Sequence, residues 1–143
     1  MASQSLKRIK YISRSSRPLT DAEVEEIREV SEKNNRQANI TGVLVETGGL
    51  FFQLIEGPSE SVDRLYKRIS EDPRHEEILL LNTMSDVEER LYPDWAMKTV
   101  HLRKVDPRAE GIRLLLETAV ENHRRVQSLS KGIERIVWGD IRA

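Results

Sequence analysis

The sequence contains no cysteine, and this absence excludes disulfide bonds, a thiolate nucleophile and a cysteine-ligated metal. An excess of charge of one sign is also missing, because 23 Lys and Arg residues stand against 24 Asp and Glu residues, for a net charge of -1. Nucleic acid and membrane surfaces are therefore not expected as partners. No stretch approaches the roughly 18 apolar residues of a membrane span, and the first residues lack the apolar core of a signal peptide. We expect a cytoplasmic protein.

Common motifs of catalysis and metal binding are missing as well. There is no nucleophile elbow, no phosphate-binding glycine-rich loop and no dinucleotide-binding fingerprint. His75, His101 and His123 lie on three separate predicted elements without the spacing of metal ligands. Phe51 and Phe52 point to opposite faces of one predicted strand, so they do not form a platform for stacking bases. The sequence therefore predicts neither an enzyme, a metal site nor an RNA-binding surface.

The length and composition of the chain fit one compact domain with a short extension. The chain has 143 residues, of which 38% are hydrophobic, enough for a single core. Residues 1–105 form the predicted domain, and residues 106–143 form a C-terminal helical extension.

Hydrophobic periodicity and turn residues predict the elements of the domain. Thr20-Asp21-Ala22-Glu23 has the form of a capping box before the first helix, and Gly48-Gly49 suits a tight hairpin turn. Predicted strands cover residues 6–13, 39–47, 50–57, 78–84 and 95–102, and predicted helices cover residues 20–34 and 58–72. The order βαββαββ is typical of a ferredoxin-like α/β (α+β) sandwich with both helices on one sheet face.

The extension begins at Asp106-Pro107, a helix start signal, and Gly132 is expected to divide it into two helices. One narrow stripe follows a 4,3,4,3 spacing through Ile112, Leu116, Ala119, His123 and Val126. Such a stripe either covers the open face of the sheet or pairs with its copy in a dimer, and the spacing does not decide between the two.

Gln53 is the most informative single residue. It is the only amide in the apolar run 49–57, and a strand this apolar on both faces is normally covered on both sides. A buried amide needs partners, and its donor and acceptor allow it to exchange them. Gln53 is therefore either a hydrogen-bonding residue of the core or the moving part of a sensor. Four further residues are able to converge on the same groove, although each has an ordinary structural explanation: Tyr11, Asn34, Trp95 and Met97.

Taken as a set, the sequence resembles a BLUF domain, the family of blue-light sensors that use flavin. The resemblance covers residues 6–102 in unbroken order and is closest to the BLUF module of photoactivated adenylyl cyclases. No cyclase sequence follows it, so cyclase activity is not expected. The matching stretches are Tyr11-Ile12-Ser13, Lys33-Asn34-Asn35, Asn39-Ile40-Thr41-Gly42-Val43-Leu44, Leu50-Phe51-Phe52-Gln53-Leu54-Ile55-Glu56-Gly57, Arg68-Ile69, Asp72-Pro73-Arg74-His75 and Pro93-Asp94-Trp95-Ala96-Met97.

The resemblance implies non-covalent FAD between the two helices, with FMN or riboflavin as substitutes. Asn34 would hold the polar edge of the flavin, and Gln53 would bridge Tyr11 to the ring. Tyr11 would be the electron and proton donor. Other contributors around the ring and its side chain would be Asn35, Arg68, Asp72 and His75.

Signalling is also implied by the resemblance. Trp95 and Met97 share one face of the predicted fifth strand, and an exchange of these two side chains near the flavin would pass the change in Gln53 to the C-terminal helices. These helices would form a homodimer or higher oligomer and act on an unidentified downstream protein. The alternative is an interaction module that kept the fold and does not respond to light.

Overall fold

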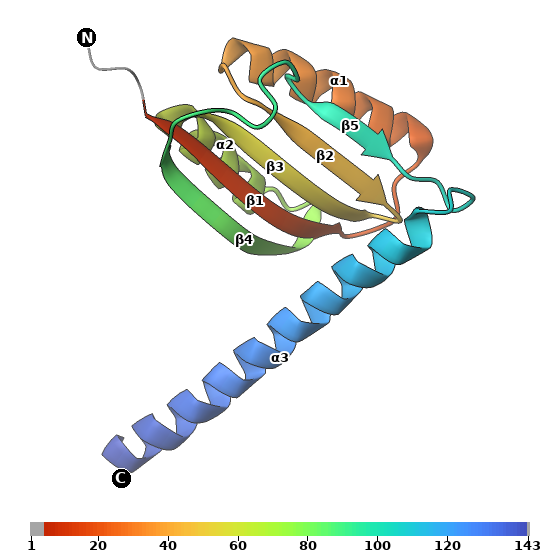
Figure 1. The fold of residues 1–143 in the computed structure, drawn as a ribbon. Coiled ribbons are helices and arrows are strands. Elements are labelled where there is room, and N and C mark those ends of the chain that lie inside the picture. The colour runs from red at the N-terminus through yellow and green to blue at the C-terminus, as the bar shows by residue number, and fades with distance from the viewer. Residues whose placement is uncertain (1–4, 143) are drawn as a thin grey trace.

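The computed structural model describes residues 5–142 and shows one mixed sheet with helices on both of its sides (Figure 1). The sheet has five strands in the order β4-β1-β3-β2-β5, all antiparallel neighbours except β2 and β5, which are parallel. In chain order the elements are β1 (Leu6–Ser15), α1 (Asp21–Gln37), β2 (Thr41–Thr47), β3 (Leu50–Pro58), α2 (Ser59–Glu71), β4 (His75–Val87), β5 (Lys98–His101) and α3 (Ala109–Arg142).

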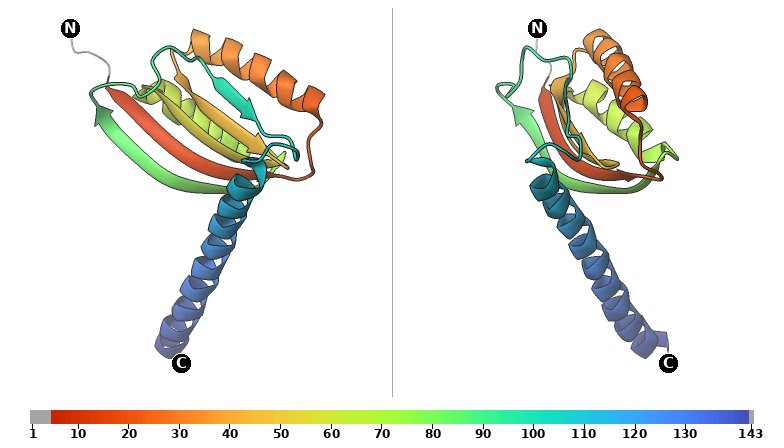
Figure 2. Two further views of the ribbon diagram at one scale, coloured as in Figure 1. Left: turned by 45° about the vertical axis from the view of Figure 1, so that its right-hand side comes forward. Right: turned by 90° about the vertical axis from the view of Figure 1, so that its right-hand side faces the viewer.

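The predicted ferredoxin-like architecture is confirmed. Helices α1 and α2 lie side by side on one face of the sheet, and α3 starts at the other side and runs away from it (Figure 2). Buried side chains on the face under α1 and α2 include Ile9, Tyr11 and Ile55, which form one cluster with Val62 of α2. This face holds the larger of the two cores, and it is the face on which a ligand between the helices would lie.

Local signals placed two features correctly. Thr20 accepts a hydrogen bond from the backbone N–H of Glu23 (3.2 Å), and the Glu23 carboxylate accepts one from the N–H of Thr20 (3.0 Å), which completes the capping box of α1. Gly48 and Gly49 both have positive φ, 58° and 82°, as a tight hairpin turn between β2 and β3 requires.

The fifth strand is shorter than predicted. β5 begins at Lys98, so Trp95 and Met97 precede it instead of lying within it. The backbone carbonyl of Trp95 accepts a hydrogen bond from the N–H of Gly42 (2.9 Å), and its ring stacks on Tyr92 at a centroid distance of 5.3 Å. These contacts hold the segment in an irregular path, which the alternating pattern of its side chains does not reveal.

The C-terminal extension is one continuous helix, so the predicted break at Gly132 is wrong. A glycine inside a helix costs only about 1 kcal/mol relative to alanine, and good helix formers surround this one. Helix α3 also begins at Ala109, slightly later than expected, while the Asp106 carboxylate accepts a hydrogen bond from the N–H of Arg108 (2.9 Å).

The structure supports the first alternative, cover of the domain's own sheet, for the N-terminal part of the stripe on α3. Leu116 and Val120 are buried against Ile12 and Leu50 on the second sheet face, so the first half of the helix covers the domain's own sheet. Val126 and later apolar residues are exposed. Of the helices within residues 5–142, none is long and apolar enough to cross a membrane.

Candidate functional site

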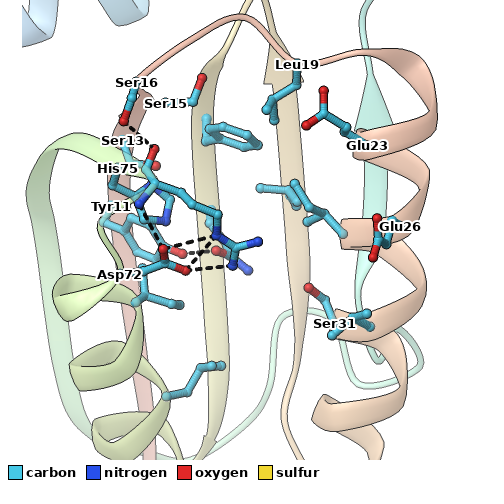
Figure 3. Close-up of a pocket in the computed structure, with 18 of the residues that line it drawn as sticks. Tyr11, Ser13, Ser15, Ser16, Leu19, Glu23, Glu26, Ser31, Asp72 and His75 are labelled. Atoms are coloured by element: carbon cyan, nitrogen blue, oxygen red, sulfur yellow. Dashed lines mark hydrogen bonds and ion pairs between the residues drawn. The ribbon is translucent and has the colours of Figure 1, made fainter.

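A cavity of about 700 Å³ opens between α1, α2 and the sheet, as Figure 3 shows. In this view Tyr11, Ser13 and His75 face Leu19 and Glu26 across the cavity. Cavities of this volume are typical of small-molecule and cofactor sites. The principal residues lining its walls are Tyr11, Ser13, Leu19, Ile27, Ser31, Asn34, Asn35, Leu44, Phe51, Gln53, Leu65, Ile69, Asp72 and His75.

Tyr11 and Gln53 meet at the floor of this cavity. The two residues are direct partners across β1 and β3, so their side chains project from the same face. The Tyr11 hydroxyl donates a hydrogen bond to Oε1 of Gln53, and Nε2 of Gln53 lies 3.6 Å from Sδ of Met97. The amide therefore connects a phenol to a thioether, and both of its polar ends are in use.

Burial fixes the protonation of Tyr11. The residue is only 2% exposed, and burial, with a smaller contribution from Tyr66, raises the pKa of Tyr11 far above its ordinary value. The rings of Tyr11 and Tyr66 meet edge to face, with centroids 5.7 Å apart. Tyr11 is therefore a neutral phenol whose proton points at the Gln53 carbonyl.

The two residues predicted to exchange near Gln53 lie in different environments. Met97 is 5% exposed and contacts the amide, whereas Trp95 is 43% exposed. Lys98 lies over the Trp95 ring, with Nζ 5.9 Å from the ring centroid. The structure thus brings Met97 to Gln53 and leaves Trp95 on the surface loop.

The two asparagines near the end of α1, Asn34 and Asn35, also differ in burial. Asn35 is 3% exposed, and its amide donates a hydrogen bond to the backbone carbonyl of Ala96 (2.9 Å). Asn34 also lines the cavity but is exposed. Neighbouring residues on a helix point about 100° apart, so only one of the two can point toward the sheet, and that one is Asn35.

At the mouth of the cavity, the turn after α2 supplies Asp72, Arg74 and His75. The Arg74 guanidinium forms an ion pair with Asp72 (2.6 Å) and lowers the pKa of that carboxyl to about 2. Burial lowers the pKa of His75, which packs edge to face with Phe51. Arg68, predicted at the site, is exposed on α2 and does not line the cavity.

Several polar residues of the cavity were not predicted. Ser13 lies two residues after Tyr11 on the same face of β1, and that spacing was the available signal. Among the described residues, four buried side-chain polar atoms have no hydrogen-bond partner, and two of them, Ser13 Oγ and His75 Nδ1, belong to residues that line the cavity. Buried polar atoms of this kind are normally satisfied, so these two point to a polar ligand. The other unpredicted polar lining residues are Ser15, Ser16, Arg17, Glu23, Glu26 and Ser31.

Metal ligation has no candidate in the described part of the chain. Within residues 5–142, no group of three or more His, Asp and Glu side chains is arranged to hold a metal ion.

Comparison with known proteins agrees with this geometry. The family model described as "BLUF: Sensors of blue-light using FAD" matches residues 6–98. A photoactivated adenylate cyclase subunit beta from Euglena gracilis is 38% identical over 93 residues, which are 64% of this chain and 11% of that protein. The chain therefore spans a small part of that relative.

Solved structures give the same result. A bacterial light-regulated adenylyl cyclase is 45% identical with a TM-score of 0.72, over 86% of this chain and 36% of that one. The dark-state structure of the BLUF protein BlrB is 35% identical with a TM-score of 0.66, over 87% of this chain and 97% of that one.

Proposed function

The chain belongs to the BLUF family of blue-light sensors that use flavin, and on this premise we propose that it binds FAD non-covalently in the cavity between α1 and α2. Residues 1–105 form the flavin-binding part, and residues 106–143 carry the response. The observation that carries the proposal is the bond from Tyr11 to Gln53 at the floor of a ligand-sized cavity. The light response is a rearrangement of hydrogen bonds, and the domain catalyses no reaction on a substrate.

The residues of the cavity fit a flavin. An isoalloxazine ring is flat and apolar with one polar edge, and the cavity combines apolar walls, such as Leu19, Ile27 and Phe51, with a few buried polar groups. The unsatisfied Ser13 Oγ and His75 Nδ1 are ready to bond a polar ligand.

Asn35, instead of Asn34, takes the polar edge of the ring. Of these two amides, only that of Asn35 is buried beside the floor of the cavity. Asn34, Asp72 and His75 also line the cavity and would contact the rest of the cofactor. Among the described residues that line the cavity, the cationic side chains are Arg17 and Arg74, and both are already paired with carboxylates, so neither is free to select a phosphate tail. FMN and riboflavin are therefore expected to substitute for FAD.

Light sensing then depends on Tyr11 and Gln53. A bound flavin, when excited by blue light, supplies a strong oxidant. Tyr11 is the buried, oxidisable side chain at the floor of the cavity, and its hydroxyl proton has a path to Oε1 of Gln53. Gln53 would give a proton from Nε2 to the flavin, which also takes up the electron that Tyr11 loses. Return of the electron and of a proton to Tyr11 would leave Gln53 rotated or tautomerised. Nε2 would then no longer face Met97 as before, and a changed hydrogen bond from Gln53 would shift the absorption of the flavin to the red.

The change reaches α3 through β5. Met97 contacts Gln53 and lies immediately before β5, which ends at His101, eight residues before α3 begins. A displaced Met97 side chain therefore acts on the strand that leads to the helix. Trp95, on the surface loop, is the candidate to take its place.

The distal half of α3 pairs with the same helix of a second copy. Val126, Leu129, Ile133 and Ile136 repeat at spacings of 3, 4 and 3, and each is more than 60% exposed. This is the repeat of a coiled-coil seam, and a seam with this spacing is complementary to itself. Ile133→Lys should convert a dimer to a monomer in sedimentation, whereas the control Gln127→Lys, beside the seam, should not. A native protein that is monomeric at all concentrations tested refutes the pairing.

One alternative function is favoured by the same exposed seam: a module that binds a partner through α3 without sensing light. Reconstitution with FAD separates the two. A coloured protein with a reversible red shift supports the sensor, and a colourless protein that still associates through α3 supports the module.

A further inference from the structure

The end of β5 carries a cluster that light sensing at Gln53 leaves unexplained. His101, the last residue of β5, lies between two carboxylates: its Nδ1 is bonded to Oε2 of Glu46, and its Nε2 lies 2.8 Å from Oδ1 of Asp21. Glu46 comes from β2 and is only 1% exposed, whereas Asp21 is in the first turn of α1. We refer to His101, Glu46 and Asp21 as the His101 clasp.

The clasp requires a protonated histidine. A neutral imidazole donates from one nitrogen only, and an imidazolium donates from both. Burial lowers the pKa of His101, but the hydrogen bonds and charges of Asp21 and Glu46 outweigh it, so that the pKa lies above its ordinary value. Arg103 is the remaining charged group beside the clasp, and it pairs with Asp21 (2.9 Å).

The clasp fastens the point at which the chain leaves the sheet for α3. β5 is an edge strand, and within residues 5–142 it pairs with β2 alone. Just beyond His101, the N–H of Leu102 donates to the Glu46 carbonyl (2.9 Å). The second oxygen of Glu46 accepts a hydrogen bond from the N–H of Gly49 (3.0 Å) in the hairpin turn. β5 is thus contacted by Gln53 through Met97 at one end and held to α1 and β2 at the other.

We propose that His101, as an imidazolium, is a positioning residue that holds the output end of β5 and thereby sets how strongly a change at Met97 is passed to α3. The proposal rests on the proposed light-sensing function. When His101 loses its proton, one of the two carboxylates loses its donor, and the end of β5 loses one of its two side-chain hydrogen bonds, either to α1 or to β2. Coupling between the flavin site and α3 therefore weakens as the pH rises through the pKa of His101.

The protonation of the clasp is measured first. The chain has three histidines, so imidazole nitrogen shifts in the holoprotein give three titrations, assigned by substitution. His101 is expected to titrate above its ordinary value, and Glu46→Gln is expected to lower the pKa of His101 because it removes one of the two carboxylates. A His101 that titrates at or below its ordinary value in the native protein, or is unmoved in Glu46→Gln, overturns the clasp.

Hydrogen exchange of residues 102–112 then tests the coupling. The holoprotein is compared in the dark and under blue light, after correction for intrinsic exchange rates. In the native protein, light should raise exchange in this segment. In His101→Gln, dark exchange should be at least tenfold faster and light should add nothing, although the red shift of the flavin persists. The control His123→Gln, which removes a histidine from α3, should behave as the native protein does.

Two results keep the clasp separate from the sensor. A native holoprotein without a red shift refutes the proposed function. The pKa of His101 and the hydrogen exchange of His101→Gln in the dark still test the clasp in that case. A His101→Gln protein with native dark exchange and a native light effect refutes the clasp alone. If His101→Gln does not fold, Asp21→Asn removes only the exposed carboxylate and should raise dark exchange by a smaller factor; no increase counts against the proposal.

Discussion

Replacing Tyr11 with phenylalanine removes one atom from the centre of the proposed relay. The ring remains in the core, so packing against Tyr66 is retained. What is lost is the hydroxyl that donates to Gln53, in a place where Tyr11 is 2% and Gln53 8% exposed. We therefore expect Tyr11→Phe to bind flavin and to lose the reversible red shift.

The magnitude of the change in stability follows from burial. Leaving a buried carbonyl without a donor costs about 1–3 kcal/mol, so the free energy of unfolding should fall by that amount. Gln53→Leu should cost a similar amount, because it leaves the Tyr11 hydroxyl without an acceptor. The double variant leaves neither group unpaired, and its loss should be smaller than the sum of the two by at least about 1 kcal/mol.

The assay is urea unfolding in the dark, with the same excess of FAD for all four proteins and correction for its measured affinity. Single losses that add within about 0.5 kcal/mol would refute the bond between Tyr11 and Gln53. A normal photocycle in Tyr11→Phe would show that Tyr11 is not the electron donor, and Trp95 would be the next candidate. The hydrogen bond from Tyr11 to Gln53 in the native protein would then be a structural contact only.

The remaining predictions concern the cavity, its mouth and the cover of the second sheet face. Asn35→Ala should weaken flavin binding at least tenfold by equilibrium dialysis and Asn34→Ala less than threefold; the opposite order would contradict the assignment. His75 is half-buried, and burial lowers its pKa, so the unfolded state binds more protons as the pH falls below about 6.5. His75→Gln should therefore lose less stability than the native protein between pH 7 and 5.5, and equal losses would count against a neutral ring at this position. Leu116→Ala, at 6% exposure, should cost about 2–5 kcal/mol, and Leu114→Ala, at 60% exposure, less than about 0.5 kcal/mol; similar costs would contradict the packing of α3.

Features with local signals were predictable from the sequence. The capping box at Thr20 and the turn at Gly48-Gly49 depend on a few adjacent residues, and both are present. The pairing of Tyr11 with Gln53 followed from the resemblance, and the register of β1 and β3 places the two residues opposite each other.

Features that depend on tertiary contacts were not predictable in the same way. Which asparagine of the pair is buried is set by the rotation of α1 against the sheet, and the spacing of residues in the sequence does not give that rotation. Trp95 fitted an alternating strand, but the bond from Gly42 and the stack on Tyr92 hold it outside β5. Gly132 suggested a break, and the helix continues because one glycine costs too little to end it.

The role of His101 shows the same limit. The spacing of the three histidines in the sequence held no sign that His101 meets a carboxylate from α1 and another from β2. Parallel pairing of β5 with β2 creates this contact, and sequence alone does not give the register of two strands so far apart in the chain.

The most direct test of the central claim is the absorption spectrum of the FAD-loaded protein before, during and after blue light, recorded for the native protein and for Gln53→Leu. If Gln53 is the relay, both proteins are coloured, the native flavin band shifts to the red and returns in the dark, and Gln53→Leu does not shift. A reversible red shift of native size in Gln53→Leu would contradict the account.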